Sequence, residues 1–330
     1  MRLVNRLSLG LALIALAAGV LLFSDRNTGR EGSGEKVYKI GLAYFAPEEG
    51  ADICIRGVLD GLRDQGFVEG RNLEVRRAHA QAEISNIPAM LQNFDGQDLD
   101  LIVPFTTPCL AAACSMVKKK PVVFTYVYDP LAAGAGRSRQ DHLPHITGVG
   151  SFPPLQDTFD TVRKVVPGLR ALGTLYNSSE ANSRKVVSEA RKLVREAGWR
   201  LEEVTITSTS EAFQAAQVLT TRNIQALWVT GDNTALQAFA AIAKAARAAR
   251  LPLIINDPEF VSQGAIVAIG IGWHQSGYAA GLLAARVLRG EKPRDIPIEE
   301  LAVKKLVVNQ QLSRELGITL PPALLAEADR

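Results

Sequence analysis

Polar side chains that could hold a small charged molecule recur in this sequence directly after short apolar runs. The stretch Asn177-Ser178-Ser179 follows the apolar run 171–176 and leads into a helix-like segment. The first N–H groups of a helix have no partner within it and lie at the positive end of its dipole, so such a place can bind a carboxylate or phosphate. Ser179 or Asn182 could equally serve only as a helix cap.

The same kinds of residue follow the other predicted strands. These stretches are Tyr44-Phe45, Phe105 to Pro108, Tyr126 to Pro130, Thr230 to Asn233 and Asn256 to Pro258. Asp129, Asp232 and Asp257 could each pair with an ammonium group, while the turn before Ser183 takes a carboxylate. A zwitterion needs both poles satisfied once it leaves water, so the set suits one. Any single Asp-Pro or Asp-Asn pair is more often a turn or cap, and their joint appearance is what indicates a site.

Sequence signatures of catalysis are missing. The chain has no Gly-x-Ser-x-Gly elbow, no phosphate loop with Gly-Lys-Ser/Thr and no His-Glu-x-x-His. None of the four histidines stands beside a serine or cysteine in a nucleophile context, and no three-ligand metal set is visible. We therefore predict a binding protein rather than an enzyme, with no catalytic residue, metal or cofactor.

Length and composition favour two domains. A chain of 330 residues with 47% hydrophobic content is too long for one ordinary core. The net charge of +3 is small and the basic residues are scattered, which gives no reason to expect nucleic acid as a partner.

From Val37 onward, apolar strand-like runs alternate with helix-like segments, one of them predicted over 234–249. This alternation is typical of α/β folds in which helices cover both faces of a parallel sheet. It forms two series of similar size. We predict one lobe from 37–150 and 272–300 and a second from 151–271 and 301–330, hinged around a cleft. Ligands of such sheets bind beyond the carboxyl ends of the strands.

The N-terminus predicts export or anchoring. Arg2 and Arg6 precede an apolar block over 7–23, and a polar, Gly-rich stretch runs on to Lys36. Residues 1–36 would then be a cleaved signal peptide, or an uncleaved membrane anchor with a linker that leaves the body of the chain outside.

The three cysteines are an odd set for an oxidising compartment. Cys54, Cys109 and Cys114 are expected to be small buried residues. Whether Cys54 pairs with one of the other two stays open at this point.

Motifs in the order of a known family run through almost the whole chain from Val37. They are Gly61 to Asn72, Asp100 to Val103, Thr107-Pro108, Pro121 to Phe124, Asp129-Pro130, Ile146 to Val149, Leu175 to Asn177 with Glu180 to Ser183, Gly231 to Thr234 and Leu306 to Asn309. On these motifs the chain resembles the substrate-binding proteins of bacterial ABC transporters, in the group related to aromatic amino-acid binders. The resemblance implies the type I periplasmic-binding fold, two parallel-sheet α/β lobes joined by a multi-crossing hinge.

The resemblance also implies which residues line the cleft. Several positions depart from it, including Phe105, Cys109 and Cys114 and two that matter most here. Thr106 stands where the family usually has glycine before Thr-Pro, and Tyr128 stands where threonine is common before Asp129. Both changes fall in the first lobe, where the side chain of a bound amino acid would lie, so they leave the identity of the solute open. The expected ligand-binding residues are Tyr44, Thr106, Thr107, Tyr128, Asp129, Asn177, Ser179, Glu180, Ala181, Asn182, Ser183, Asp232, Asn233 and Asp257.

We expect an exported receptor on the periplasmic or outer face of the membrane that binds an amino acid or similar small zwitterion and delivers it to an ABC permease. A membrane-tethered sensor that signals to a separate membrane partner is the alternative. A cytoplasmic transcription regulator on the same fold would need a helix-turn-helix where this chain has its apolar block.

Overall fold

The computed structural model describes residues 36–301 and 303–329. The chain divides into Met1–Val37 and Tyr38–Arg330, and all elements below lie in the second unit. The expected signal peptide or anchor, with its apolar block 7–23, lies outside the described residues. Among the helices that the structure does describe, none is both long enough and apolar enough to cross a membrane.

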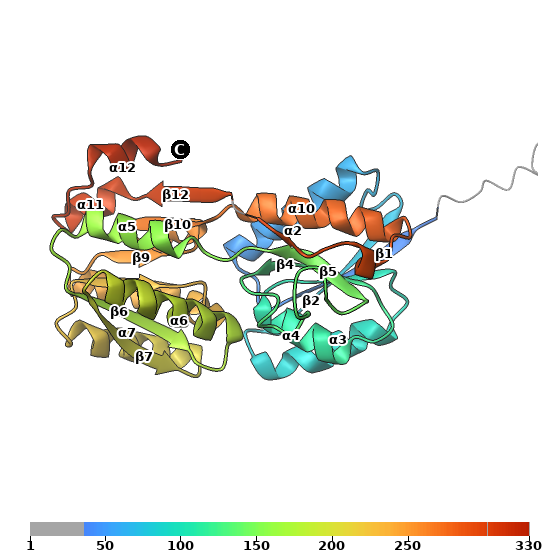
Figure 1. Ribbon diagram of the computed structural model, residues 1–330, viewed down its shortest axis with the longest axis horizontal. Helices are drawn as coiled ribbons and strands as arrows, with labels where there is room; N and C mark the ends of the chain where they lie inside the picture. The colour runs from blue at the N-terminus through green and yellow to red at the C-terminus, as the bar shows by residue number, and fades with distance from the viewer. Residues whose placement is uncertain (1–35, 302, 330) are drawn as a thin grey trace, which may run out of the picture. The chain divides into compact units, whose positions relative to one another are not determined.

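Two six-stranded sheets form the framework (Figure 1). The first sheet has the strand order β11 (Glu299–Glu300), β5 (Ile146–Gly150), β4 (Val122–Val127), β3 (Leu101–Pro104), β1 (Tyr38–Tyr44) and β2 (Leu73–His79). The second has the order β12 (Lys304–Val308), β10 (Val267–Ile271), β9 (Leu253–Ile255), β8 (Ala226–Val229), β6 (Ala171–Asn177) and β7 (Arg200–Ile206). All pairings are parallel except that of β12 with β10. The predicted fold class is confirmed.

Helices cover both faces of each sheet, which is why the central strands are apolar along their whole length. The first sheet packs α2 (Glu49–Asp64) and α10 (Trp273–Leu288) on one face, and α3 (Ile87–Gly96) and α4 (Thr107–Met116) on the other. The second packs α5 (Leu155–Val165) and α6 (Ala181–Glu196) on one face, and α7 (Ala212–Thr220) and α9 (Phe239–Ala248) on the other. The remaining elements are α8 (Asn233–Gln237), α11 (Gln310–Glu315), α12 (Pro322–Glu327), η1 (Ile84–Asn86), η2 (Thr209–Glu211), η3 (Pro258–Gln263) and η4 (Pro293–Asp295).

The strand order makes the chain change sheets after β5, after β10 and again between β11 and β12. One apolar cluster joins the two sheets, because residues of α2 and α10 and residues of α5 and α6 belong to the same buried core. The exact lobe boundaries expected from the sequence stay a prediction.

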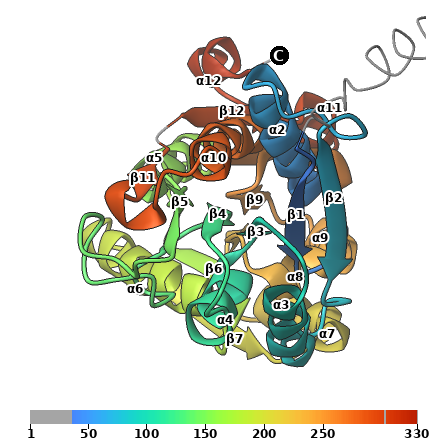
Figure 2. The ribbon, with the colours of Figure 1, turned by 90° about the vertical axis from the view of Figure 1, so that its right-hand side faces the viewer.

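Helices α2 and α10 lie side by side (Figure 2), with α10 packed on β4 and β5, and the contact between the two helices is unusually close. Gly57 and Gly61 on α2 face Gly277 and Gly281 on α10. A β-carbon on Gly61 would lie 2.5 Å from the carbonyl oxygen of Tyr278, and one on Gly277 would overlap backbone atoms of α2. The glycines therefore allow the two backbones to touch. This contact places the start of α10 beside the start of α2, where the candidate site lies.

The structure bears on the predicted helix 234–249 and on the pairing of the cysteines. The helix predicted over 234–249 is divided into α8 and α9 at Ala238, whose φ of −108° and ψ of 14° leave the helical region. The three cysteines are free, so no disulfide involves Cys54. Cys54 and Cys109 are buried, and burial raises the pKa of each thiol to about 12, so both are protonated and inert at neutral pH.

Candidate functional site

A small cavity lies where strand ends of the two sheets meet. Its lining comes from β4, from the first turns of α4, α6 and α10, from α8, and from loops that follow strands of both sheets: Thr107, Tyr126, Tyr128, Asn182, Gly231, Asn233, Leu236, Asp257 and Trp273. Its free volume of ≈ 10 Å³ is room for about one water molecule. The cleft is thus closed on its own side chains, and an amino acid could enter only after these groups move apart.

Aromatic rings make the wall on the side of the first sheet. Tyr126 meets Trp273 edge to face, with ring centroids 4.2 Å apart, and Tyr128 stacks on Trp273 at 6.3 Å. Tyr126 has a positive φ of 60°, and the register of β4 against β5 shifts between Phe124 and Val127. Bulges of this kind redirect side chains beside sites. The irregularity in β4 therefore turns Tyr126 towards the cleft.

Asp257, which follows β9, is the acidic side chain of the cavity. It is fully buried, and its Oδ2 accepts a hydrogen bond of 3.1 Å from the Tyr126 hydroxyl. Burial, followed by the charges of Glu48 and Glu259, raises the pKa of Asp257 well above its usual value, although Trp273 and Tyr126 oppose the rise. Within normal hydrogen-bond geometry, neither Asp257 Oδ1 nor Trp273 Nε1 has a partner. A buried acceptor without a partner is costly, and a ligand could satisfy it.

Glu180 lies behind the cavity and binds the start of α8. One carboxylate oxygen accepts from the backbone N–H and hydroxyl of Thr234 at 3.0 and 2.8 Å, and the other accepts from the backbone N–H of Asn233 at 3.0 Å. The positive end of α8 is therefore filled by an anion of the chain itself. Glu180 makes no side-chain cap on its own helix, α6, so its carboxylate does not use the first N–H groups of that helix.

Asp232 is also used within the chain. Its Oδ2 accepts from Asn177 N at 2.7 Å and from Ser183 Oγ at 2.6 Å, and its Oδ1 caps α8 through Ala235 N at 2.7 Å. Burial, and then the charge of Glu180, raise the pKa of Asp232 to about 7. This geometry argues against the expected contact of Asp232 with an ammonium group, because both oxygens already have donors and Asp232 does not line the cavity.

Asn177 and Ser179 hold the same network together rather than facing the cavity. The Asn177 side chain donates to Thr234 Oγ1 at 3.0 Å and accepts from Ser179 N and Oγ at 2.9 and 2.7 Å. Asn182 is different, because it lines the cavity: its amide donates to Gly231 O at 3.0 Å, while its buried Oδ1 has no partner. The anion-holding turn predicted over Glu180 to Ser183 thus presents mainly Asn182 to the cleft.

The structure brings together some of the expected site residues and separates others. Thr107, Tyr128, Asn182, Asn233 and Asp257 line the cavity. The rest do not line it: Asn177, Ser179, Glu180, Ser183 and Asp232 form the network behind it, Thr106 is buried beside it, Ala181 is half-buried in the first turn of α6, Tyr44 packs on His79, and Asp129 caps the backbone of residues 131 and 132.

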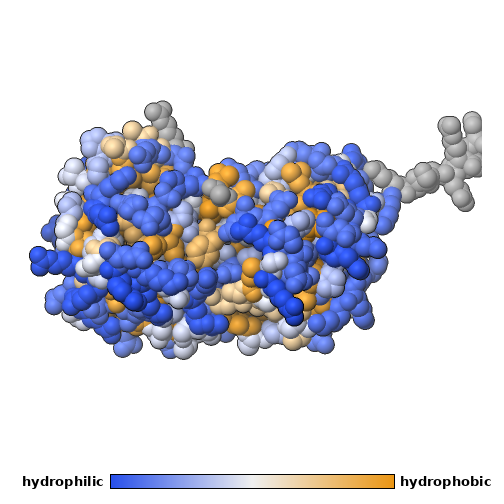
Figure 3. Space-filling view, viewed as in Figure 1, coloured by the Kyte–Doolittle hydropathy of each residue, from blue (hydrophilic) through white to orange (hydrophobic). Residues whose placement is uncertain are grey.

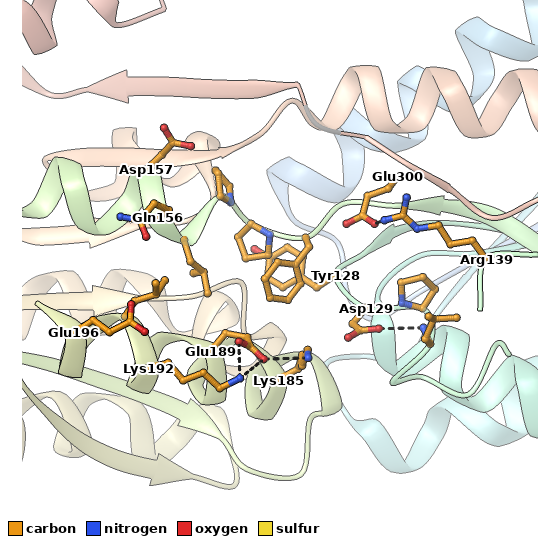
Figure 4. Close-up of a pocket in the computed structure, with 17 residues that line it drawn as sticks. Tyr128, Asp129, Arg139, Gln156, Asp157, Lys185, Glu189, Lys192, Glu196 and Glu300 are labelled. Atoms are coloured by element: carbon orange, nitrogen blue, oxygen red, sulfur yellow. Dashed lines mark hydrogen bonds and ion pairs between the residues drawn. The ribbon is translucent and has the colours of Figure 1, made fainter. Parts of the chain in front are cut away.

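A larger open groove of ≈ 760 Å³ lies on the other side of Tyr128. In Figure 4, Tyr128 lies between two groups of charged side chains, with Lys185, Glu189 and Lys192 on one side and Arg139 with Glu300 on the other. These charges pair with one another. Polar residues dominate the face in Figure 3, and apolar side chains gather near its middle. The small cavity is the better candidate site, because Asn182 Oδ1, Asp257 Oδ1 and Trp273 Nε1 line it and lack hydrogen-bond partners, whereas the charged groups of the groove pair with one another.

Sequence reasoning missed Glu48, Tyr126, Gly231, Leu236 and Trp273 as site residues. Tyr126 and Gly231 stand within two of the polar stretches identified after strands, and Trp273 follows β10 in the same way. Glu48 follows β1 and caps α2 through Gly50 N and Ala51 N. Position along the chain could have marked four of the five, because Tyr126 lies at the end of β4 and Glu48, Gly231 and Trp273 lie close after a strand, whereas Leu236 lies within α8.

Comparison with known proteins identifies the family. A family model described as ABC transporter substrate binding protein matches residues 39–330. The chain belongs to this family. A tyrosine-binding protein of Clostridioides difficile is 28% identical over 310 residues, which cover 92% of this chain and 90% of that protein.

Two solved structures of family relatives add detail. An ABC domain in complex with L-Trp from Streptococcus pneumonia has a TM-score of 0.85 at 28% identity and covers 89% of this chain and 99% of that chain. The ligand-free, open structure of a substrate binding protein with adhesive properties from Clostridium difficile has a TM-score of 0.66 at 26% identity and covers 87% and 97%.

Proposed function

We propose that this chain is the extracytoplasmic receptor of an ABC importer and that it binds an amino acid, or a similar small zwitterion, between its two lobes. The observation that carries the proposal is the cavity itself, in which aromatic rings surround a buried carboxylate whose Oδ1 has no partner. Asp257 would hold the ammonium group, and the first turn of α6 with Asn182 would hold the carboxylate. Tyr128, Trp273 and Leu236 would surround the side chain.

Hinge closure is the mechanism we propose. The chain superposes better on the L-Trp complex than on the open, ligand-free relative, although the identities of 28% and 26% are nearly the same. This difference supports a closed arrangement of the cleft. A ligand that contacts residues of both sheets favours the closed form by its differential affinity, so binding and closure are one equilibrium. Export and delivery to a permease are the roles of the family, and we extend them to this chain.

A thermal-shift screen of the full chain tests the proposal. L-Tyrosine and L-tryptophan come first, because relatives are described with them, followed by the other amino acids and related small metabolites. A binding solute raises the melting temperature in proportion to the logarithm of its concentration above Kd. If no such solute shifts the melting temperature, the proposal fails.

A matched pair of variants tests the site. Asp257→Asn should abolish the ligand-induced shift, whereas Asp129→Asn, the same change at the groove, should leave it intact. The opposite result would move the ammonium contact to Asp129, as the sequence alone allowed.

A further inference from the structure

Three hydrogen-bonded side chains cross the cleft beside the cavity. Glu48 caps α2 on the side of the first sheet, Asp257 ends β9 of the second sheet, and the Tyr126 hydroxyl lies between them. The hydroxyl oxygen is 3.0 Å from Glu48 Oε1 and 3.1 Å from Asp257 Oδ2. Both contacts have hydrogen-bond length, and together they form the bridge Glu48–Tyr126–Asp257.

The number of protons in this bridge decides its charge. A tyrosine hydroxyl carries one proton and can donate one hydrogen bond, whereas two ionised carboxylates would both need to accept one. Burial, followed by the charges of Asp257 and Glu48, raises the pKa of Tyr126 well above its usual value, so the hydroxyl keeps its proton. With both carboxylates charged, one contact would set an oxygen lone pair against a negative charge. The bridge therefore needs one more proton on a carboxyl group.

The ionisable groups around the bridge favour an extra proton on one of its two carboxyl groups. The ionisable groups that face the bridge are Asp52 on α2, Cys54 on α2, Tyr128 after β4, and Glu259 on η3, whose Oε1 pairs with Lys305 at 3.0 Å. The residues lining the described cavity include no lysine or arginine. Burial raises the pKa of Glu48, and the charge of Asp52 adds to the rise. The local field thus favours one added positive charge.

A proton and an ammonium group satisfy the same need, because each brings a positive charge and donates to carboxylate oxygens. Asp257 Oδ1 has no hydrogen-bond partner and lies at the cavity, where a ligand would arrive. The faces of Tyr126 and Trp273 also suit a cation, since aromatic rings attract ammonium groups.

We propose that Glu48, Tyr126 and Asp257 form a site for one positive charge across the cleft, occupied by a shared proton in the empty protein and by the ammonium group of the solute in the loaded protein. The ammonium half rests on the proposed function, and the proton half does not. Glu48 is thereby assigned a part in solute recognition, and closure of the empty protein is linked to pH.

The proton half is tested on the full chain without any solute. Melting temperatures of the wild type and of Glu48→Gln are measured from about pH 5 to 9. A shared proton held in the folded protein is lost as pH rises, so the wild-type melting temperature should fall over this range more steeply than that of Glu48→Gln, whose neutral amide needs no proton. Glu49→Gln, the same change at the exposed neighbouring residue, should follow the wild type. Equal slopes for the wild type and Glu48→Gln would overturn the proton half, whatever the absolute stability of the variant.

The ammonium half is tested by calorimetry of the full chain with L-tyrosine and with tyramine, which keeps the ammonium group and lacks the carboxylate. Titrations in two buffers of different ionisation enthalpy count the protons exchanged. The wild type should release about one proton for each ligand bound near neutral pH, and Glu48→Gln should release fewer. Binding without proton release overturns the ammonium half and leaves the receptor function standing. Failure of both probes to bind overturns it too and counts against the proposed function, while the slopes of the empty protein still decide the proton half.

Discussion

The hydroxyl of Tyr128, which follows β4 in the first sheet, lies against the α-carbon of Gly231, which follows β8 in the second. A β-carbon on Gly231 would overlap the hydroxyl oxygen and lie 2.5 Å from Tyr128 Cζ. Tyr128 is buried, and its ring separates the small cavity from the open groove. The closed cleft therefore depends on the absence of a side chain at Gly231.

Gly231→Ala should weaken solute binding by obstructing closure. An overlap of this kind costs about 1–3 kcal/mol, and each 1.4 kcal/mol is tenfold in affinity, so the Kd should rise by roughly 5- to 150-fold. Small-angle scattering of the empty variant should give a larger radius of gyration than the wild type. The double variant with Tyr128→Ala should regain the compact form, because the overlapping ring is gone. A Gly231→Ala protein as compact as the wild type would contradict this role.

Asp232→Ala should lower the free energy of unfolding, and it should affect solute binding less, because Asp232 does not line the cavity. Its carboxylate accepts from Asn177, Ser183 and Ala235, and the change removes both a helix cap and a buried acceptor. We expect the free energy of unfolding to fall by about 2–4 kcal/mol in denaturant titrations. Asp141→Ala, at an exposed aspartate in the loop before β5, should change it little. A stable Asp232→Ala protein that no longer binds solute would instead restore the ammonium contact expected from the sequence.

The stability of the wild type should fall as pH rises through the range in which Asp232 titrates. The pKa of Asp232 is about 7 in the folded chain, against about 3.9 for an unperturbed aspartate. The folded state therefore binds the proton more tightly, so this contribution is complete below about pH 4 and is lost as pH rises through about 7. The slope reaches at most about 1.4 kcal/mol per pH unit. Asp232→Ala should reduce the wild-type slope and leave the part that the bridge Glu48–Tyr126–Asp257 contributes. A slope unchanged from the wild type would assign all of it to other groups.

Gly277→Ala should destabilise the contact between α2 and α10. Its β-carbon would overlap the carbonyl of Cys54, and backbone atoms cannot turn aside as a flexible side chain can. The helices must separate, which we expect to cost about 1–3 kcal/mol. Gly96→Ala is the matched control, because a β-carbon there meets nothing within 4 Å, and alanine suits a helix better than glycine. Equal melting temperatures of the two variants would show that α2 and α10 are not held at this distance.

Thr106→Gly should stabilise the chain. Thr106 has a φ of 78° and a ψ of 152°, a region populated almost only by glycine, and its buried Oγ1 has no partner. Relief of the backbone should raise the free energy of unfolding by about 1–2 kcal/mol. Asn223→Gly, at an asparagine with a φ of 53°, should change it less, because asparagine tolerates the left-handed region. Loss of stability in Thr106→Gly would mean that the threonine side chain contributes more than its strain costs.

The sequence by itself determined the alternating α/β pattern, because the period of apolar residues and the turn residues between elements are local properties. It also located the places where ligand groups could lie, since Asn182, Tyr128 and Asp257 all follow strands or begin helices. The family resemblance marked Thr106 as a departure from the usual glycine, and its backbone angles in the structure are ones that suit glycine.

Only the tertiary structure decided which polar groups are already used. Glu180 and Asp232 are acidic residues that follow strands, as expected of site residues. Each nevertheless accepts hydrogen bonds from a segment about fifty residues away in the chain, and no local pattern reveals such contacts. The bridge Glu48–Tyr126–Asp257 likewise joins three distant segments. A side chain's role as ligand contact or as structural acceptor depends on whether its hydrogen bonds are satisfied within the fold, and that is a property of the assembled sheets rather than of any stretch of residues.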